Sequence, residues 1–90
     1  MTVRTLKAVV TGRVQGVFYR VSVKEVAATL SIHGFAKNLM NGDVEVEATG
    51  QEEDLMAMVD YLKQGPVAAK VDTVVWEYSE TKSVEGFLIL

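Results

Sequence analysis

The sequence predicts an α+β sandwich in which two helices cover one face of a mainly antiparallel sheet of four or five strands. The chain has 90 residues and is 49% hydrophobic, which suits one domain with an efficient core. Apolar residues alternate in strand-like segments and recur at i, i+3, i+4 and i+7 in two helix-like segments. Each half of the chain has the order strand, helix, strand.

The first half contains a predicted strand, a loop with glycines and a helix. Apolar residues alternate along residues 6–10, which favours a strand, and a loop follows at residues 12–16. One apolar stripe at helical spacing predicts the helix: Val23, Val26, Ala27 and Leu30. We expect this helix to end near residues 31–34.

A β-hairpin is predicted around Asn41-Gly42, because both residues tolerate the positive φ of a tight turn. It joins a strand at residues 34–39 to one at residues 44–48, and we expect Gly50 to break the second strand. The acidic side chains of this region are interpreted as a solvated face: Asp43, Glu45 and Glu47.

The second half repeats the pattern. Three acidic residues at 52–54 favour a helix start, and Gly65-Pro66 favours a helix end. The stripe between them predicts the side that faces the core: Leu55, Met58, Val59 and Leu62. Residues 71–78 predict a strand on which Trp76 and Tyr78 pack, and residues 87–90 predict a short final strand.

The resulting order, βαββαβ, is the ferredoxin-like split βαβ pattern, and we expect residues 1–90 to form one such domain. In this topology the strand at 34–39 runs parallel to the strand at 6–10, with one strand between them. Their C-terminal ends therefore lie at the same end of the sheet, about 10 Å apart.

Composition and charge exclude several kinds of chemistry. The chain has no cysteine and one histidine, which excludes thiol nucleophiles, zinc ribbons and multi-histidine metal sites. A net charge of −3 argues against nucleic acid as a partner. The chain has no apolar run of membrane-spanning length. Residues 1–7 lack the apolar core of a signal peptide, so we expect none. We expect a cytoplasmic protein that needs no cofactor and no metal.

The segment Gly-Arg-Val-Gln-Gly-Val-Phe-Tyr-Arg, residues 12–20, is the first candidate site. Its glycines let backbone N–H groups converge on an anion, and the helix start adds unpaired N–H donors. A cation such as Arg20 is unfavourable beside the positive end of a helix dipole, but its planar guanidinium suits phosphate oxygens. The residues alone leave open a plain connecting loop with a surface arginine.

Asn38 is the second candidate, at the C-terminal end of the strand at 34–39. An amide side chain has one acceptor and two donors, which suits the orientation of a water beside a phosphoryl group. The alternative is a structural asparagine at the end of a hairpin. His33 is interpreted as a polar residue at the helix end rather than as a catalytic group.

Two motifs resemble the acylphosphatase family. Residues 12–20 match its pattern Gly-x-Val-Gln-Gly-Val-x-(Phe/Tyr)-Arg, and residues 38–45 resemble its block Asn-x-x-Asp-Gly-x-Val-Glu. Asn41 stands where the family usually has Asp, and Ser31 where a helix-ending glycine is common. The resemblance covers nearly the whole chain and implies metal-independent hydrolysis of acylphosphates on a ferredoxin-like fold.

The resemblance also implies the roles of individual residues. Arg20 would bind the phosphate, and Asn38 would orient the attacking water. Backbone N–H groups would form a phosphate cradle: those of Gln15, Gly16, Val17, Phe18, Tyr19 and Arg20. The implied partner is a small-molecule acylphosphate, with inorganic phosphate as product, and we expect a monomer.

Two other functions stay open, because a fold does not fix a function. One is a small-ligand regulatory domain on the same fold. The other is an accessory acylphosphatase-like domain, as in carbamoyl-transfer maturation proteins. An RNA-binding sheet would need an aromatic, basic motif, and a heavy-metal module would need a cysteine pair, and the sequence has neither.

Overall fold

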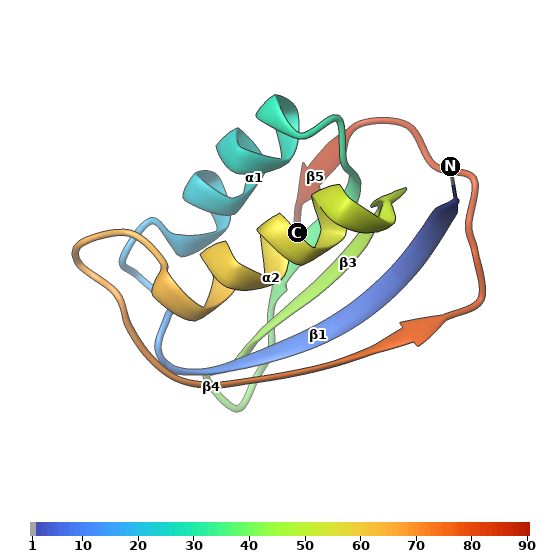
Figure 1. Ribbon diagram of the computed structural model, residues 1–90. Helices are drawn as coiled ribbons and strands as arrows, with labels where there is room; N and C mark the ends of the chain where they lie inside the picture. Colours follow the sequence, from blue (N-terminus) through green and yellow to red (C-terminus); the bar gives the residue numbers. More distant parts are fainter. Residues whose placement is uncertain (1) are drawn as a thin grey trace.

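The computed structural model describes residues 2–90 and places two helices on one face of a single sheet (Figure 1). The elements follow the predicted order and end with a fifth strand: β1 Val3–Arg13, α1 Tyr19–Thr29, β2 His33–Asn38, β3 Val44–Gln51, α2 Glu52–Gln64, β4 Lys70–Ser79 and β5 Phe87–Ile89. The predicted ferredoxin-like fold is confirmed.

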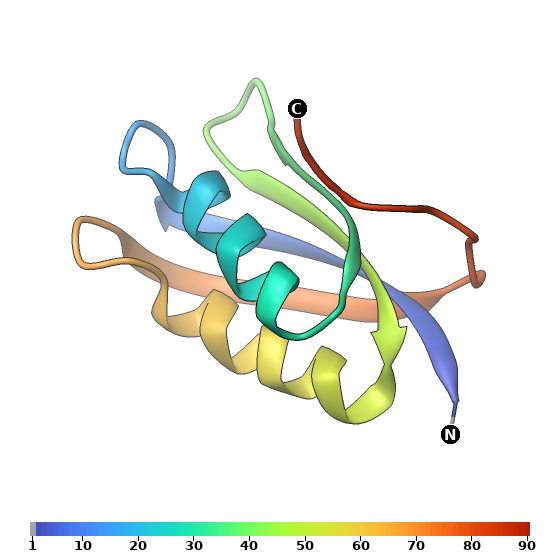
Figure 2. The same ribbon diagram turned by 90° about the horizontal axis from the view of Figure 1, so that it is seen from above.

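The five strands lie in the order β4-β1-β3-β2-β5. All neighbours are antiparallel except β2 and β5, which run parallel. Figure 2 shows the two helices side by side over this sheet. Because β1 and β2 each pair antiparallel with β3, they run parallel to one another, and their C-terminal ends lie at the same end of the molecule.

The core fills the space between the sheet and the helices. Alternate side chains of β1 and β3 face the helices and have no exposed surface: Leu6, Ala8, Val10, Val44, Val46 and Ala48. The predicted α2 stripe is buried throughout, and α1 buries Val23 and Ala27, with Val26 and Leu30 packed at the edge of the core. Burial of this apolar surface holds each helix on the sheet.

The other face of the sheet is partly covered by residues 80–86, which connect β4 to β5. The prediction that Glu47 is solvated is wrong, since this residue is only 6% exposed. Lys82 lies over it, with Nζ 3.0 Å from Glu47 Oε1, and the Lys82 backbone N–H donates to Thr5 Oγ1 at 3.0 Å. Asp43 and Glu45 keep partial exposure.

Two predicted strand boundaries are corrected by the pairing of the sheet. β1 continues past the expected end through Gly12, with a bulge, because β4 pairs alongside it. A Cβ at Gly12 would lie 2.2 Å from the Lys70 carbonyl oxygen, so this approach requires glycine. Gly50 does not break β3, since it pairs with Arg4, and α2 begins directly after the strand.

Candidate active site

The loop between β1 and α1, residues 14–18, alternates in the sign of its backbone φ just before the helix begins. Gly16 and Phe18 have φ of 75° and 63°, whereas Val17 and Tyr19 have negative φ. Alternation of this kind lets successive N–H groups converge on an anion. α1 begins at Tyr19 and adds the unpaired donors and positive dipole of its first turn.

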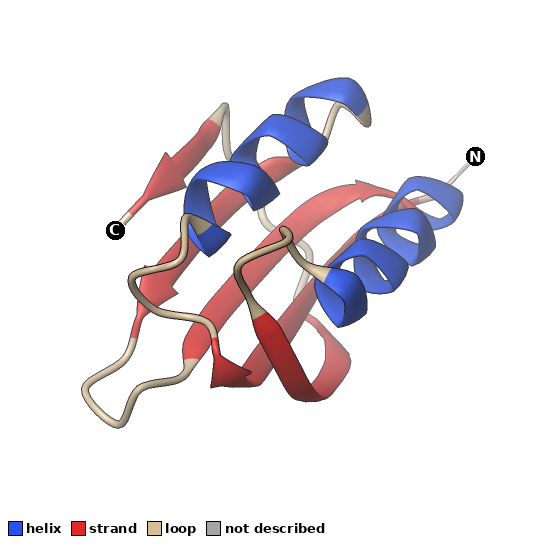
Figure 3. Cartoon of the chain, turned by 90° about the vertical axis from the view of Figure 1, so that its left-hand side faces the viewer, coloured by secondary structure: helices blue, strands red, loops and turns tan. Residues whose placement is uncertain are grey.

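The loop lies at the same end of the molecule as the loops that follow β2 and α2 (Figure 3). A hollow of about 250 Å³ lies against it. Six residues line this hollow: Val14, Gly16, Phe18, Tyr19, Arg20 and Val21. The candidate cradle therefore opens to solvent beside the Arg20 side chain.

Arg20 is the second residue of α1, and tertiary contacts draw its side chain towards β2. Its Nη1 donates to the main-chain oxygen of Leu90 at 2.7 Å, and the Leu90 N–H donates to the Ala36 carbonyl of β2 at 2.9 Å. No acidic residue stands in the first turn of α1 to balance this cation. An anion bound at the loop would balance the charge and the helix dipole together.

Asn38 is the last residue of β2, two positions beyond Ala36 and on the same, helix-covered face of the strand. Its Oδ1 is buried and has no hydrogen-bond partner within residues 2–90. Buried acceptors are normally paired, so this oxygen is suited to accept a hydrogen bond from a water in the site. Asn38 is not among the residues that line the hollow beside the loop.

The Gln15 side chain joins the loop to the hairpin that follows Asn38. Its Nε2 donates to the carbonyl oxygens of Leu39, at 2.8 Å, and Asp43, at 2.9 Å. The family resemblance implies only a backbone role for Gln15. Its two side-chain partners lie 24 and 28 residues away, so no local pattern could have indicated them.

Tyr19 anchors the start of α1 in the core. It is 1% exposed, and its hydroxyl donates to the Leu62 carbonyl of α2 at 2.7 Å. Burial raises the pKa of this hydroxyl well above its usual value, and the neighbouring Tyr61 adds to the rise. The backbone N–H of Tyr19 thus lies at the start of α1, while its neutral side chain fixes the helix in place.

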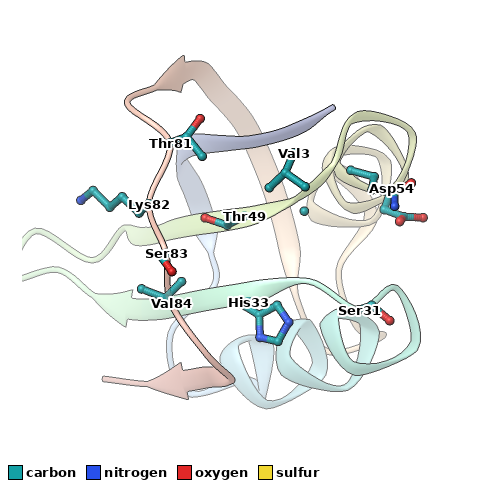
Figure 4. A pocket seen from close by; sticks show the side chains of 11 residues that line it. Val3, Ser31, His33, Thr49, Asp54, Thr81, Lys82, Ser83 and Val84 are labelled. Carbon is teal, nitrogen blue, oxygen red and sulfur yellow. The ribbon is translucent and has the colours of Figure 1, made fainter. Parts of the chain in front are cut away.

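A larger hollow, of about 530 Å³, lies at the opposite end of the sheet and contains none of the candidate site residues (Figure 4). Several of its polar groups are already paired. His33 Nδ1 accepts from the Gly86 N–H at 2.7 Å, Thr49 Oγ1 bonds Thr5 Oγ1 at 2.6 Å, and Lys82 pairs with Glu47. His33 opens β2 rather than capping α1, and it lies far from the candidate cradle.

Two kinds of feature are missing from the described part of the chain. Residues 2–90 contain no cluster of three or more His, Cys, Asp or Glu side chains that could hold a metal ion. They also contain no helix that is long and apolar enough to cross a membrane.

Comparison with known proteins assigns the family. The sequence model of acylphosphatases matches residues 6–89. The chain belongs to the acylphosphatase family. An acylphosphatase of Deinococcus radiodurans is 44% identical over 84 residues, which cover 93% of this chain and 97% of the relative.

Solved acylphosphatase structures have the same fold. The enzyme from Coxiella burnetii superposes with a TM-score of 0.94 at 36% identity and covers 98% of this chain and 93% of its own. The enzyme from Bacillus subtilis gives 0.93 at 31% identity and 99% coverage of both chains. The protein is therefore an acylphosphatase that acts on a small-molecule substrate, and these matches favour the enzyme over a regulatory binding module.

Proposed function

We propose that this acylphosphatase splits the carboxyl-phosphate bond by direct attack of a water on phosphorus, without a metal. Arg20 and the backbone N–H groups of residues 15–20 hold the phosphoryl group, and Asn38 orients the water. The observation that carries the proposal is the alternation of φ at residues 16–19, placed directly before Arg20. This arrangement presents several donors to one anion at a helix start.

The chemistry matches the limited set of side chains. A carboxylate leaves as a weak base, so the P–O bond can break without a general acid. Phosphoryl transfer depends mainly on positioning and on stabilisation of charge on the phosphoryl oxygens. The attacking water forms the new P–O bond, and its proton passes to a phosphate oxygen of the substrate. The products are the carboxylate and inorganic phosphate.

Benzoyl phosphate hydrolysis, followed by loss of absorbance with and without a chelator, tests the proposal. We expect Arg20→Gln to lower kcat/KM by about 10²–10³-fold, as for loss of one preorganised donor. Arg4→Gln is the matched control, because Arg4 lies at the other end of β1 and pairs with Glu52. Activity that survives in Arg20→Gln, or is lost to the chelator, contradicts the mechanism.

Asn38→Ala separates orientation of the water from binding of the phosphate. We expect kcat to fall by about 10²-fold, the scale of a misplaced reactant, with little change in inhibition by inorganic phosphate. Loss of phosphate inhibition in Asn38→Ala but not in Arg20→Gln would reverse the two roles.

We also propose that residues 1–90 act as one domain, as a cytoplasmic monomer that binds neither nucleic acid nor membrane. The negative net charge and the cysteine-free composition support this assignment. Among residues 2–90, 17 buried hydrophobic residues form one cluster, which supports a core that closes without a partner. Sedimentation of the purified protein tests the monomer, with a dimer mass as the contrary result.

A further inference from the structure

Phe18 occupies a position that favours glycine or a small polar residue over an aromatic one. Its backbone is left-handed, with φ 63° and ψ 22°, a region that suits glycine or asparagine. It is the N-cap of α1, yet its side chain makes no capping hydrogen bond. The ring is also 78% exposed, so packing in the core does not compensate for either disadvantage.

The backbone role of Phe18 does not explain why its side chain is an aromatic ring. The cradle needs only an N–H group and a left-handed backbone at this position, and glycine or asparagine would supply both at lower cost. The next residue shows the contrast, because the Tyr19 ring is buried and hydrogen-bonded. An aromatic side chain that is exposed, strained and placed at a binding loop indicates a role in the site.

The surroundings of the ring show which role it can have. Phe18 and Val21 line the same hollow as Arg20, and Val21 is 46% exposed. One hollow therefore combines a cation and backbone donors with an apolar wall. An acylphosphate has the same two parts, a charged phosphoryl group and an acyl group.

We propose that Phe18 and Val21 form the acyl-group subsite and select acylphosphates with an aromatic or branched apolar acyl group over acetyl or carbamoyl phosphate. This inference rests on the proposed function, because the phosphoryl group must first be held by Arg20 and the loop. The acyl group then covers the exposed ring and removes apolar surface from water. An aromatic acyl group also makes a favourable ring-to-ring contact with Phe18, which stabilises the complex beyond burial of apolar surface.

The test compares kcat/KM for benzoyl phosphate with kcat/KM for acetyl phosphate in four variants. Phe18→Asn removes the ring and tolerates the left-handed backbone, and Val21→Ala removes two methyl groups in α1. Phe18→Tyr keeps a ring. Val75→Ala is the matched control for Val21→Ala, because Val75 is 70% exposed on β4, pairs with Val9 and does not line this hollow.

We expect the benzoyl-to-acetyl ratio to fall about fivefold in Phe18→Asn, the scale of one aromatic contact, and by a smaller factor in Val21→Ala. Phe18→Tyr and Val75→Ala should keep the ratio of the unaltered enzyme. The inhibition constant of inorganic phosphate should change less than the ratio, since phosphate has no acyl group.

An unchanged ratio in Phe18→Asn, with both substrates still hydrolysed, overturns the subsite and leaves the proposed function intact. An equal loss with both substrates, accompanied by weaker phosphate inhibition, also overturns it, because the ring would then act through the cradle. Failure of the unaltered enzyme to hydrolyse either substrate contradicts the proposed function itself.

Discussion

Gln15 contributes both its backbone and its side chain to the candidate site. Its backbone belongs to the loop that would hold the phosphate, and its side chain bonds two carbonyl groups of the hairpin that follows Asn38. The Gln15 side chain therefore links the loop directly to the residues that follow Asn38. The family motif singled out Gln15, but only the fold supplies the reason for a glutamine, because a shorter side chain would not span the two segments.

The stability of the protein should depend on pH through the buried Tyr19 hydroxyl. Its pKa is raised in the folded protein, so above about pH 10 the hydroxyl ionises in the unfolded chain first. The unfolded state then binds fewer protons, and the stability contributed by Tyr19 is complete below pH 10 and decreases above it. At pH 11 the decrease amounts to about 1.4 kcal/mol for this one group.

Urea unfolding of the unaltered protein and of Tyr19→Phe between pH 7 and 11 measures this effect. Between pH 7 and 9 the variant should be less stable by a constant amount, about 1–3 kcal/mol, because the buried Leu62 carbonyl loses its donor. Above pH 10 the difference should shrink. Parallel curves up to pH 11 would show that the Tyr19 hydroxyl ionises equally easily in both states.

At the scale of elements, the C-terminal end of α1 departs from the family pattern. Ser31 follows the helix at φ 54°, the left-handed conformation in which glycine is usual. The sequence showed a serine at a position where glycine is common, and the structure shows that the backbone keeps the glycine conformation. The other departure is compensated, since Asn41 Oδ1 accepts from the Asp43 N–H at 3.0 Å and holds the hairpin turn.

We therefore expect Ser31→Gly to stabilise the protein by about 1 kcal/mol, the cost of one left-handed L-residue. The free energy of unfolding in urea measures the change, and Ser31→Ala, which keeps a Cβ, is the control without stabilisation. Benzoyl phosphate turnover should stay the same, because Ser31 lines the hollow at the opposite end of the sheet. A destabilised Ser31→Gly would mean that the serine stabilises this turn in another way.

Most elements could be predicted because the residues that indicate them lie close together in the sequence. The apolar stripes located both helices, and Asn41-Gly42 located the hairpin. The errors concern partners that are distant in sequence. β1 and β3 extend past Gly12 and Gly50 because neighbouring strands pair with those residues, and Glu47 is buried because residue 82 lies over it.

At the scale of the whole molecule, the candidate site joins both halves of the chain. Arg20 reaches Leu90 beside β2, the loop reaches the β2–β3 hairpin through Gln15, and Tyr19 reaches α2. A phosphate bound there should therefore stabilise the whole fold, because it binds the native state and not the unfolded chain.

Thermal unfolding with inorganic phosphate tests this coupling. At about ten times its Kd, phosphate stabilises a one-site protein by about 1.4 kcal/mol, which corresponds to a Tm increase of roughly 6–10 °C for a chain of this size. Sodium chloride at equal ionic strength is the control, and Arg20→Gln should lose most of the increase. An equal increase in Arg20→Gln would place phosphate at another site.

Sequence alone indicates the order of the elements, the apolar faces of both helices, the resemblance to the family and the two motifs that carry Arg20 and Asn38. These properties depend on residue type and on short-range spacing, which can be read directly from the amino-acid sequence. The tertiary structure decided the partners of Gln15 and Arg20, the burial of Tyr19 and Glu47, and the exposure of the strained Phe18 ring. Each of these contacts and exposures depends on segments that are far apart in the sequence and meet only when the sheet forms. No local sequence pattern therefore indicates them.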